Sequence, residues 1–375
     1  MLGYLVRGPI GGLAWHHMQY VLGLARLGHD VYFLEDSDDF PSCYDPSRNL
    51  TDCDPTYGLE FTARFFSDLG LQGRWAYHDA HTSTWLGHGP QVASACRDAD
   101  LLLNLSGVNP IRSWCAEIPV RALIDTDPVF VQVRHLQNPA ARQAALMHNA
   151  FFSFGEDIDQ LRAAAADGLP WRPTRQPVVL DQWSPTPPPP DGRFTTVMQW
   201  DSYPAVEHQG RAYGMKSASF GPYLDLPART GRSFELAIGD APEALRAAGW
   251  RTVNSLEMTR TPWTYQAYIR GSKAEFSVAK HGYVASNCGW FSERTACYLA
   301  SGRAAVVQDT GFTRWLGADR GVLAFTNPEE ASAAVEAVDA ELGLHSAAAR
   351  QVAEAFFDSS RVLSLLIEQA FEAPR

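Results

Sequence analysis

The sequence lacks the features that mark membrane, secreted and nucleic-acid-binding proteins. No apolar run reaches the ~20 residues that span a bilayer, and the N-terminus does not place a basic region before an apolar one, as secretory signals do. Basic residues are the minority, with 31 Lys and Arg against 42 Asp and Glu and a net charge of −11. Because binding to a duplex requires Lys and Arg to neutralise phosphates, we expect no nucleic-acid partner. We expect a cytoplasmic protein without a transmembrane segment.

Cysteine is also scarce, and the six residues are scattered without a pair at the spacing of metal ligands. Scattered cysteines in a long chain are typical of reduced thiols, so no metal site is predicted. Apolar material is plentiful, since 46% of the residues are hydrophobic and only 19% are charged. This composition supports a large core and excludes disorder. The length of 375 residues favours two domains of ordinary size.

The N-terminal half alternates strand-like and helix-like segments. An apolar run at 2–6 leads into a glycine-rich turn at 8–12, and from Ala14 the apolar residues recur at helical spacing until Gly28. A second apolar run at 31–34 completes a strand–helix–strand unit. The alternation continues with expected helices at 60–69 and 91–99 and expected strands at 101–105, 120–124 and 150–154.

A run of four prolines at 187–190 divides the chain. Such a run favours an extended polyproline segment and excludes helix, so we expect a domain linker at 184–193. The alternation then resumes, with expected strands at 195–198, 234–238, 274–278, 304–307 and 322–325 and expected helices at 242–248, 262–269, 292–300 and 328–342.

These segments predict an N-terminal domain at 1–183, a C-terminal domain at 194–357, and a last helix at 358–375 that packs back on the first domain. The predicted fold class is α/β, with two Rossmann-like doubly wound domains that face each other across a cleft. In such folds ligands bind at the carboxyl ends of the strands. The cleft is therefore the expected site.

The most informative stretch lies between 274 and 312. A predicted strand leads into a loop that carries Lys280 and His281, and a helix then begins with Ser292, Glu293, Arg294 and Thr295. Free N–H groups and the positive end of the dipole attract anions to a helix start, and the side chains here add donors. This segment suits a diphosphate. The alternative is that Ser292 only caps the helix and that Glu293 and Arg294 are solvated.

The end of this stretch resembles the donor-binding segment of GT-B glycosyltransferases. A predicted helix ends in Leu-Ala-Ser-Gly-Arg at 299–303, two valines follow at 306–307, and Asp309, Thr310 and Gly311 come next. The resemblance implies a group 1-like donor domain at the C-terminus and an acceptor-binding domain at the N-terminus. It also implies a hexosyltransferase with a UDP-sugar co-substrate, a small-molecule or glycan acceptor, no other cofactor, and no metal for the diphosphate.

The resemblance and the positions of the predicted strand ends together suggest a set of donor-binding residues: Lys216, Lys280, His281, Ser292, Glu293, Arg294, Thr295, Asp309, Thr310 and Gly311. Lys216 belongs to the set because it follows the first strand of the second domain, although a solvated surface lysine is an equal alternative. The sequence departs from the family pattern at Cys297, where many GT-B enzymes place a glutamate that binds the nucleotide ribose. Glu293, one helical turn earlier, offers a carboxylate on a similar face.

Transfer with inversion needs a base that takes the acceptor proton, and the N-terminal domain offers two kinds. Gly11 and Gly12 form an acceptor-side loop, and His16 and His17 lie in the helix that follows. Histidine suits proton transfer near neutral pH, and some inverting GT-B enzymes use a histidine near this place. The rival is Asp127, which follows a predicted strand. We predict an inverting transfer with one of these residues as the base.

Two other functions fit the same pattern. A non-hydrolysing nucleotide-sugar epimerase has the same two domains and would convert the donor without an acceptor. A catalytically degenerate GT-B chain would bind a nucleotide sugar or a partner without transfer. Eleven tryptophans add aromatic faces for sugars or for packing, with Trp85, Trp114 and Trp183 as candidates.

Overall fold

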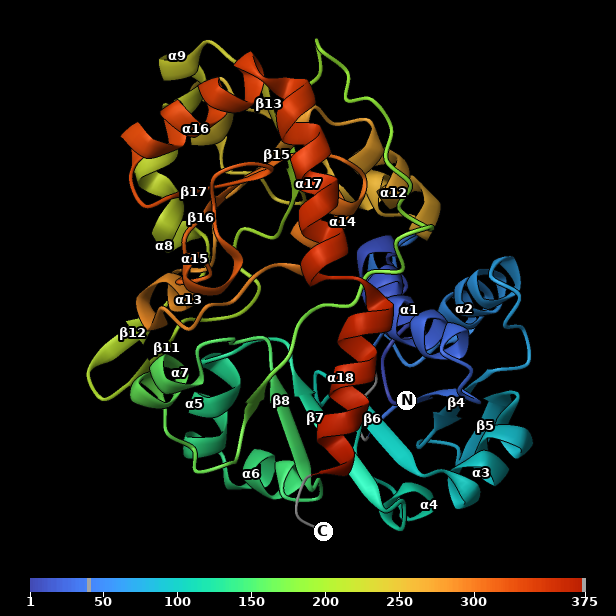
Figure 1. Cartoon of the computed structure of the whole chain (residues 1–375). Coiled ribbons are helices and arrows are strands. Elements are labelled where there is room, and N and C mark those ends of the chain that lie inside the picture. Colours follow the sequence, from blue (N-terminus) through green and yellow to red (C-terminus); the bar gives the residue numbers. More distant parts are fainter. Residues whose placement is uncertain (39–41, 373–375) are drawn as a thin grey trace.

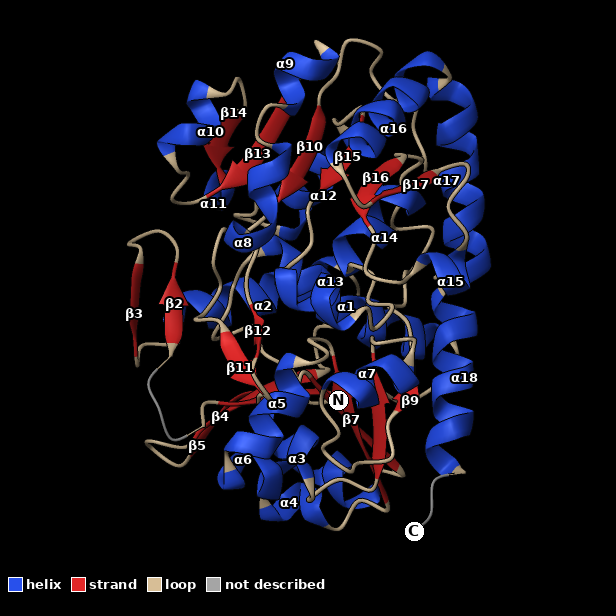
Figure 2. Cartoon of the chain, turned by 90° about the vertical axis from the view of Figure 1, so that its left-hand side faces the viewer, coloured by secondary structure: helices blue, strands red, loops and turns tan. Residues whose placement is uncertain are grey.

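The computed structural model describes residues 1–38 and 42–372 and contains two α/β domains. The N-terminal domain forms the lower half of the molecule in Figure 1, and the C-terminal domain forms the upper half. The last helix, α18 (Ser359–Phe371), returns to the lower domain, and Figure 2 shows it beside the lower sheet. None of the described helices is long and apolar enough to cross a bilayer.

The N-terminal domain is built on a mainly parallel sheet whose centre is Leu2. This residue pairs with Leu34 on one side and with Asn104 on the other, and so joins two groups of strands. The groups are β1 (Phe33–Asp36), β4 (Trp75–Asp79) and antiparallel β5 (Thr84–Gly87), and β6 (Leu101–Leu105), β7 (Val120–Asp125), β8 (Ala150–Ser153) and β9 (Arg172–Pro173). With Leu2 counted as the first strand, the parallel strands follow the doubly wound order 3-2-1-4-5-6, with β9 added as a seventh strand beside β8.

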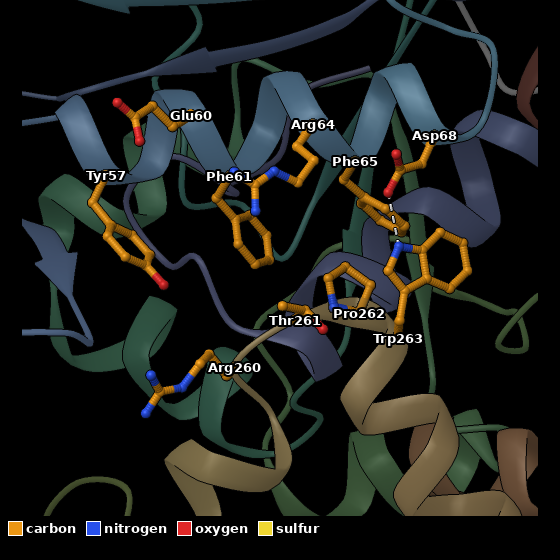
Figure 3. Close-up of a pocket in the computed structure, with 10 residues that line it drawn as sticks. All are labelled: Tyr57, Glu60, Phe61, Arg64, Phe65, Asp68, Arg260, Thr261, Pro262 and Trp263. Atoms are coloured by element: carbon orange, nitrogen blue, oxygen red, sulfur yellow. Dashed lines mark hydrogen bonds between the residues drawn. The ribbon is translucent and has the colours of Figure 1, made fainter.

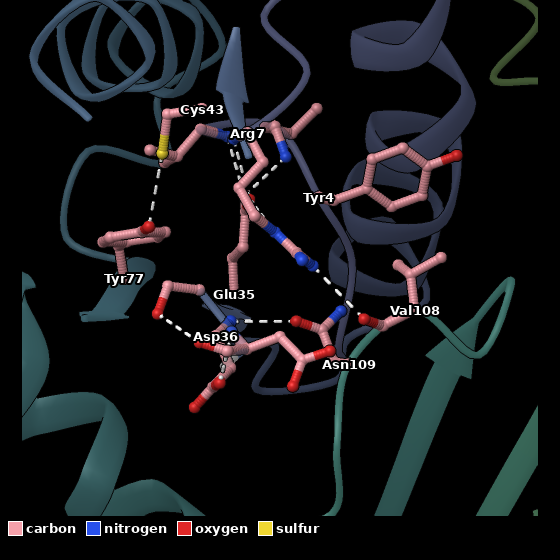
Figure 4. A network of polar contacts seen from close by, with 12 residues as sticks. Tyr4, Arg7, Glu35, Asp36, Cys43, Tyr77, Val108 and Asn109 are labelled. Atoms are coloured by element: carbon pink, nitrogen blue, oxygen red, sulfur yellow. Dashed lines mark hydrogen bonds and ion pairs between the residues drawn. The ribbon is translucent and has the colours of Figure 1, made fainter. Parts of the chain in front are cut away.

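The strand predicted at 2–6 is wrong beyond its beginning. The backbone N–H groups of Leu5, Val6 and Arg7 donate to the carboxylate of Glu35 at 2.5, 2.7 and 2.8 Å, and not to a neighbouring strand. The carboxylate is fully buried and also pairs with the Arg7 guanidinium at 3.2 Å, as Figure 4 shows. A buried side chain therefore replaces the ladder here and turns the chain toward the other domain.

Helices of the N-terminal domain cover this sheet, and the longest of them also meets the second domain. In α1 (Gly11–Arg26), Trp15 and Met18 are buried, and the indole of Trp15 donates to the Pro262 carbonyl at 2.9 Å. The domain also holds α2 (Thr56–Asp68), α3 (Gly89–Asp98), α4 (Ser113–Ala116), α5 (Phe130–Gln137), α6 (Pro139–Ala145), α7 (Ile158–Ala164) and the hairpin of β2 (Cys43–Asp45) and β3 (Leu50–Asp52).

The C-terminal domain has a six-stranded parallel sheet in the order β14-β13-β10-β15-β16-β17, which is again 3-2-1-4-5-6. The topological switch point lies between β10 and β15. The strands are β10 (Phe194–Val197), β13 (Phe234–Ile238), β14 (Arg251–Asn254), β15 (Ala274–Ser277), β16 (Ala305–Gln308) and β17 (Val322–Phe325). All but β14 were predicted to within one residue.

The helices of the C-terminal domain include several that the sequence did not predict, and the longest of them is α17 (Leu342–Phe356). Residues 279–291 were expected to form a loop, but they contain α13 (His281–Ser286), which ends where Asn287 adopts a left-handed conformation, with φ +53°. The others are α8 (Ser217–Phe220), α9 (Leu226–Thr230), α10 (Glu243–Ala247), α11 (Ser255–Met258), α12 (Pro262–Arg270), α14 (Glu293–Ala300), α15 (Thr313–Leu316), α16 (Pro328–Ala340) and α17 (Leu342–Phe356), with a short 3-10 turn, η1 (Gly221–Tyr223), and a hairpin of β11 (Val206–His208) and β12 (Arg211–Tyr213).

Two chain segments cross between the domains side by side. Val178, ahead of the proline run, pairs with Asp358 at the start of α18. The proline-rich segment is fastened to the C-terminal domain, because the buried Arg303 guanidinium donates to the backbone carbonyl and the hydroxyl of Thr186 at 2.5 and 2.7 Å. The helix α18 contacts α1 and β7 of the N-terminal domain. Near the C-terminal end of this helix, Arg172 donates to the Gln369 carbonyl at 2.8 Å.

Candidate functional site

A cavity of about 740 Å³ lies between the two domains. Its walls come from the carboxyl ends of central strands in both sheets, so the two switch points face each other. The N-terminal domain contributes Tyr4, Gly8, Gly12, His16, Ser106 and Asp127, and the C-terminal domain contributes Met198, Trp200, Lys216, Lys280, Glu293 and Arg294, among others. The volume is ample for a nucleotide and a second molecule beside it.

Three cations gather on the C-terminal wall of this cavity. The chain has only three lysines, Lys216, Lys273 and Lys280, and two of them line the cavity together with Arg294. The ammonium group of Lys216 donates to the Val278 carbonyl just beyond β15. Burial, and next the charge of Arg294, lower the pKa of Lys216 well below its usual value. The positive charges gathered on this wall favour binding of an anion.

Arg294 joins the ends of the two central strands. Its guanidinium donates to Glu275 at 2.7 Å, to the Ser277 hydroxyl at 2.7 Å and to the Val197 carbonyl at 2.8 Å. Burial opposes the charge, yet the Glu275 carboxylate holds the pKa of Arg294 above its usual value. The alternative of a solvated Arg294 is therefore wrong. The residue holds the ends of the two strands together and also lines the cavity.

The start of α14 also faces the cavity. The Ser292 hydroxyl caps the helix by accepting from the Arg294 N–H at 3.2 Å, and Ser292 and Glu293 both line the wall. Within residues 1–38 and 42–372, the Glu293 carboxylate has no hydrogen-bond partner. Beside it, Trp290 stacks on Tyr283 with a centroid distance of 4.0 Å. The helix start therefore offers donors, a free carboxylate and an aromatic wall.

Asp127 and Lys280 form an ion pair that bridges the domains, with 3.0 Å between Oδ1 and Nζ. The hydroxyls of Tyr203 and Tyr283 donate to the same carboxylate, and Lys280 donates to the Tyr203 hydroxyl at 2.9 Å. The ammonium group also lies 4.5 Å from the centre of the Tyr203 ring. Two residues predicted for different tasks, base and phosphate ligand, are thus partners in this Asp127–Lys280 bridge.

The turn that carries Asp127 is strained and tightly held. Val129 has φ +68°, a conformation that a β-branched residue rarely adopts. The buried carboxylate of Asp125 accepts from the Asp127 N–H, the Gln132 amide and the Ser153 hydroxyl at 2.8, 2.9 and 2.7 Å. Burial raises the pKa of Asp125 to about 6. Strain of this kind persists only where the surroundings enforce it, which is typical of functional sites.

The two histidines of α1 have different surroundings. His16 lines the cavity, and its ring lies 6.2 Å from Phe154; burial lowers the pKa of His16 to about 4. His17 is fully buried, with Nδ1 2.8 Å from the Leu13 carbonyl and Nε2 accepting from the Tyr4 N–H at 3.1 Å. Both ring nitrogens of His17 are occupied by backbone groups. The prediction of His17 as the base therefore does not match its position, and His16 remains the candidate on this helix.

Gly11 and Gly12 lie where the domains touch. The Gly11 N–H donates to the Thr259 carbonyl at 2.6 Å, and a Cβ on Gly11 would lie 2.3 Å from the Thr261 carbonyl oxygen. Gly12 lines the cavity, and a Cβ there would lie 3.5 Å from the Tyr265 ring. These glycines permit close contact with the second domain next to the cavity.

Five predicted donor-binding residues are absent from the described lining of the cavity: His281, Thr295, Asp309, Thr310 and Gly311. Asp309 accepts from the Gly311 N–H at 2.8 Å, and Thr310 donates to the Trp290 carbonyl, so this turn supports the loop before α14. The His281 ring accepts from the Gly214 N–H at 3.3 Å. These residues position the wall and do not face the cavity.

Sequence reasoning missed the aromatic part of the site. The tryptophans on the cavity are Trp200 and Trp290, whereas Trp183 is fully buried and Trp85 packs on Trp114 elsewhere. Tyr203 and Tyr283 were also missed. Tyr203 follows the predicted first strand of the second domain, and this position is the one signal that could have indicated it.

The two facing doubly wound domains define the GT-B fold, and solved structures confirm it. Among them is an alpha-glucosyltransferase in complex with UDP and a 13-mer DNA containing a HMU base (TM-score 0.57, 8% identity, 99% of this chain and 98% of that chain). Others are Anabaena HepE in complex with UDP and glucose (0.56, 10%, 95% and 96%) and AviGT4, a glycosyltransferase involved in avilamycin A biosynthesis (0.51, 13%, 96% and 90%). No family model and no curated protein matches the sequence.

Proposed function

We propose that this protein is a glycosyltransferase that moves a sugar from a UDP-sugar to a small-molecule or glycan acceptor. The observation that carries the proposal is the cluster of Lys216, Lys280 and Arg294 at the switch point of the C-terminal sheet, inside the inter-domain cavity. UDP is the nucleotide named for two of the structures to which the chain is similar. The GT-B fold supplies the two facing domains that such a transfer needs.

In this proposal the C-terminal domain stabilises the leaving diphosphate. Lys216, Lys280 and the capped start of α14 supply positive charge and N–H donors, and Arg294 holds the ends of β10 and β15 in place. Donors fixed before the reaction stabilise developing negative charge without reorganisation. Holding donor and acceptor together across the cavity adds the advantage of proximity.

The proposed base is His16, from the opposite wall. A histidine whose pKa is lowered to about 4 is neutral at physiological pH and is able to accept the proton of an acceptor hydroxyl. Asp127 is the second candidate, although its carboxylate is taken up by Lys280, Tyr203 and Tyr283. A base on the acceptor side corresponds to inversion at the sugar carbon.

The test measures UDP release from UDP-glucose, UDP-galactose and UDP-N-acetylglucosamine, with and without a mixture of sugar acceptors. We expect release that requires acceptor and that is lost in Lys216→Met. Lys273→Met is the matched control, because Lys273 does not line the cavity. Its ammonium group pairs with the Asp339 carboxylate at 2.6 Å. Donor conversion without acceptor would indicate the epimerase, and binding of UDP without release would indicate a degenerate GT-B chain.

A further inference from the structure

A second pocket, of about 120 Å³, lies outside the main cavity in a groove between the domains. One wall is a face of α2 with Tyr57, Phe61 and Phe65, and the other wall is the start of α12 with Trp263. Figure 3 shows the Tyr57 and Phe61 rings directed down from α2 toward the segment that carries Arg260 and Trp263. We call this pocket the α2–α12 groove.

The aromatic surface of the groove is fixed in place and partly open. Trp263 is 36% exposed, and its indole N–H donates to Asp68 at 2.8 Å. Its ring also packs edge-on against Trp15 and Phe65, with centroid distances of 5.4 and 5.7 Å. An exposed tryptophan held on one side by packing and at its nitrogen by a carboxylate presents a rigid apolar face.

Unpaired polar groups surround this face. Glu60, Arg64 and Arg260 line the groove and are exposed, and within the described residues their side chains make no hydrogen bond or ion pair. Together with Asp68 they add two positive and two negative charges, so the groove has no net charge. A neutral ligand that both donates and accepts hydrogen bonds matches this balanced set of charges.

We propose that the α2–α12 groove binds a neutral oligosaccharide. Sugar hydroxyls both donate and accept hydrogen bonds, and the C–H face of a pyranose ring packs on an aromatic ring. The groove and the main cavity are lined by neighbouring residues of one segment, since Thr259 lines the cavity and Arg260 and Thr261 line the groove. The inference rests on the proposed function, because it assigns the groove to the part of a glycan acceptor or product that extends beyond the reacting end.

The test uses an array of neutral oligosaccharides of one to eight sugar residues, probed with the full chain and with its variants. We expect retention that increases with length and falls at least tenfold in Trp263→Ala and Arg260→Ala. Arg260 is exposed and unpaired, so its replacement leaves the fold intact even if Trp263→Ala does not fold. Arg361→Ala, on the exposed face of α18, is the matched control.

Absence of any retained glycan, or retention that both groove variants leave unchanged, overturns the inference. Calorimetry of UDP binding on the same samples separates it from the proposed function. UDP binding and sugar transfer without a dependence on the groove would leave the glycosyltransferase standing and remove the groove. Glycan retention that depends on the groove, without UDP binding, would support the groove and contradict the proposed glycosyltransferase.

Discussion

Single residues at this site differ because of their surroundings and not because of their type. His16 and His17 are neighbours in α1, yet only His16 lines the cavity, while His17 is fixed between the Leu13 and Tyr4 backbones. The same contrast separates Lys216 and Lys273, of which only Lys216 lines the cavity. Composition and spacing do not report such differences, which depend on which side of a helix or loop is buried.

The first prediction concerns the base. Because His16 lines the N-terminal wall of the cavity, where we propose that the acceptor binds, His16→Ala should lower kcat by ~10²–10⁴-fold while UDP affinity stays nearly unchanged. With the pKa of His16 at about 4, kcat should stay flat from pH 8 to 5, and not fall near pH 6–7 as an unperturbed histidine would require. Kinetics of the wild type, His16→Ala and the surface control His29→Ala across this range check both points. A parental kcat in His16→Ala would assign the base elsewhere.

The second prediction concerns stability against pH. Burial lowers the pKa values of His16, His17 and His148 to about 4, 3 and 4, from 6.5 in the unfolded chain. The unfolded state therefore binds more protons below pH 6.5, and stability must fall as the pH drops from 6.5 toward 4. The expected loss is on the order of 1 kcal/mol per histidine for each pH unit. Urea unfolding at pH 7.5, 6.5 and 5.5 measures it, and equal midpoints would contradict it.

At the scale of elements, most of the buried strands and the helices α12, α14 and α16 were predictable, whereas the buried strand β4 and several connecting helices were not. Strands such as β6 and β13 are largely buried and mostly apolar, and their bounds were predicted without error. The segment at 2–6 is equally apolar, but the Glu35 carboxylate takes its N–H groups, which no local pattern reveals. Likewise, the Asp127–Lys280 bridge joins residues 153 positions apart, so only the tertiary fold brings them together.

The third prediction concerns Arg294, whose hydrogen bonds join the ends of β10 and β15. Removal of the Arg294 side chain leaves the Glu275 carboxylate, which is fully buried, without its cation. We expect Arg294→Ala to lower the free energy of unfolding by about 3–5 kcal/mol. In the Arg294→Ala variant, a second substitution, Glu275→Gln, should restore most of the lost free energy of unfolding. If urea unfolding of Arg294→Ala matches the wild type, the join is not structural.

At the scale of the whole molecule, the proposed donor site and the domain contact share a residue. Lys280 lines the C-terminal wall of the cavity and at the same time pairs with Asp127 of the N-terminal domain. A diphosphate that recruits Lys280 competes with this pair, so donor binding and the Asp127–Lys280 bridge are coupled. Through the bridge, binding of a diphosphate to the C-terminal domain would change the surroundings of the Asp127 carboxylate on the N-terminal domain.

The fourth prediction follows from this coupling. Asp127→Asn frees Lys280 and should tighten UDP binding several-fold, whereas Lys280→Met removes a phosphate partner and should weaken it by about tenfold or more. Tyr203→Phe keeps both charges and deletes only a hydroxyl, so it should change the affinity least. Changes of the same sign in Asp127→Asn and Lys280→Met would show that the two residues do not compete in this way.

The central claim is that the cations at the C-terminal switch point bind a nucleoside diphosphate. Titration calorimetry of UDP into the wild type, Lys216→Met and Lys273→Met tests it most directly. A charge-assisted contact contributes ~1.5–3 kcal/mol, so the Kd of Lys216→Met should be about tenfold or more above that of the wild type. Lys273→Met should bind UDP as the wild type does. The absence of UDP binding to the wild type, or an equal Kd in Lys216→Met, would contradict the claim.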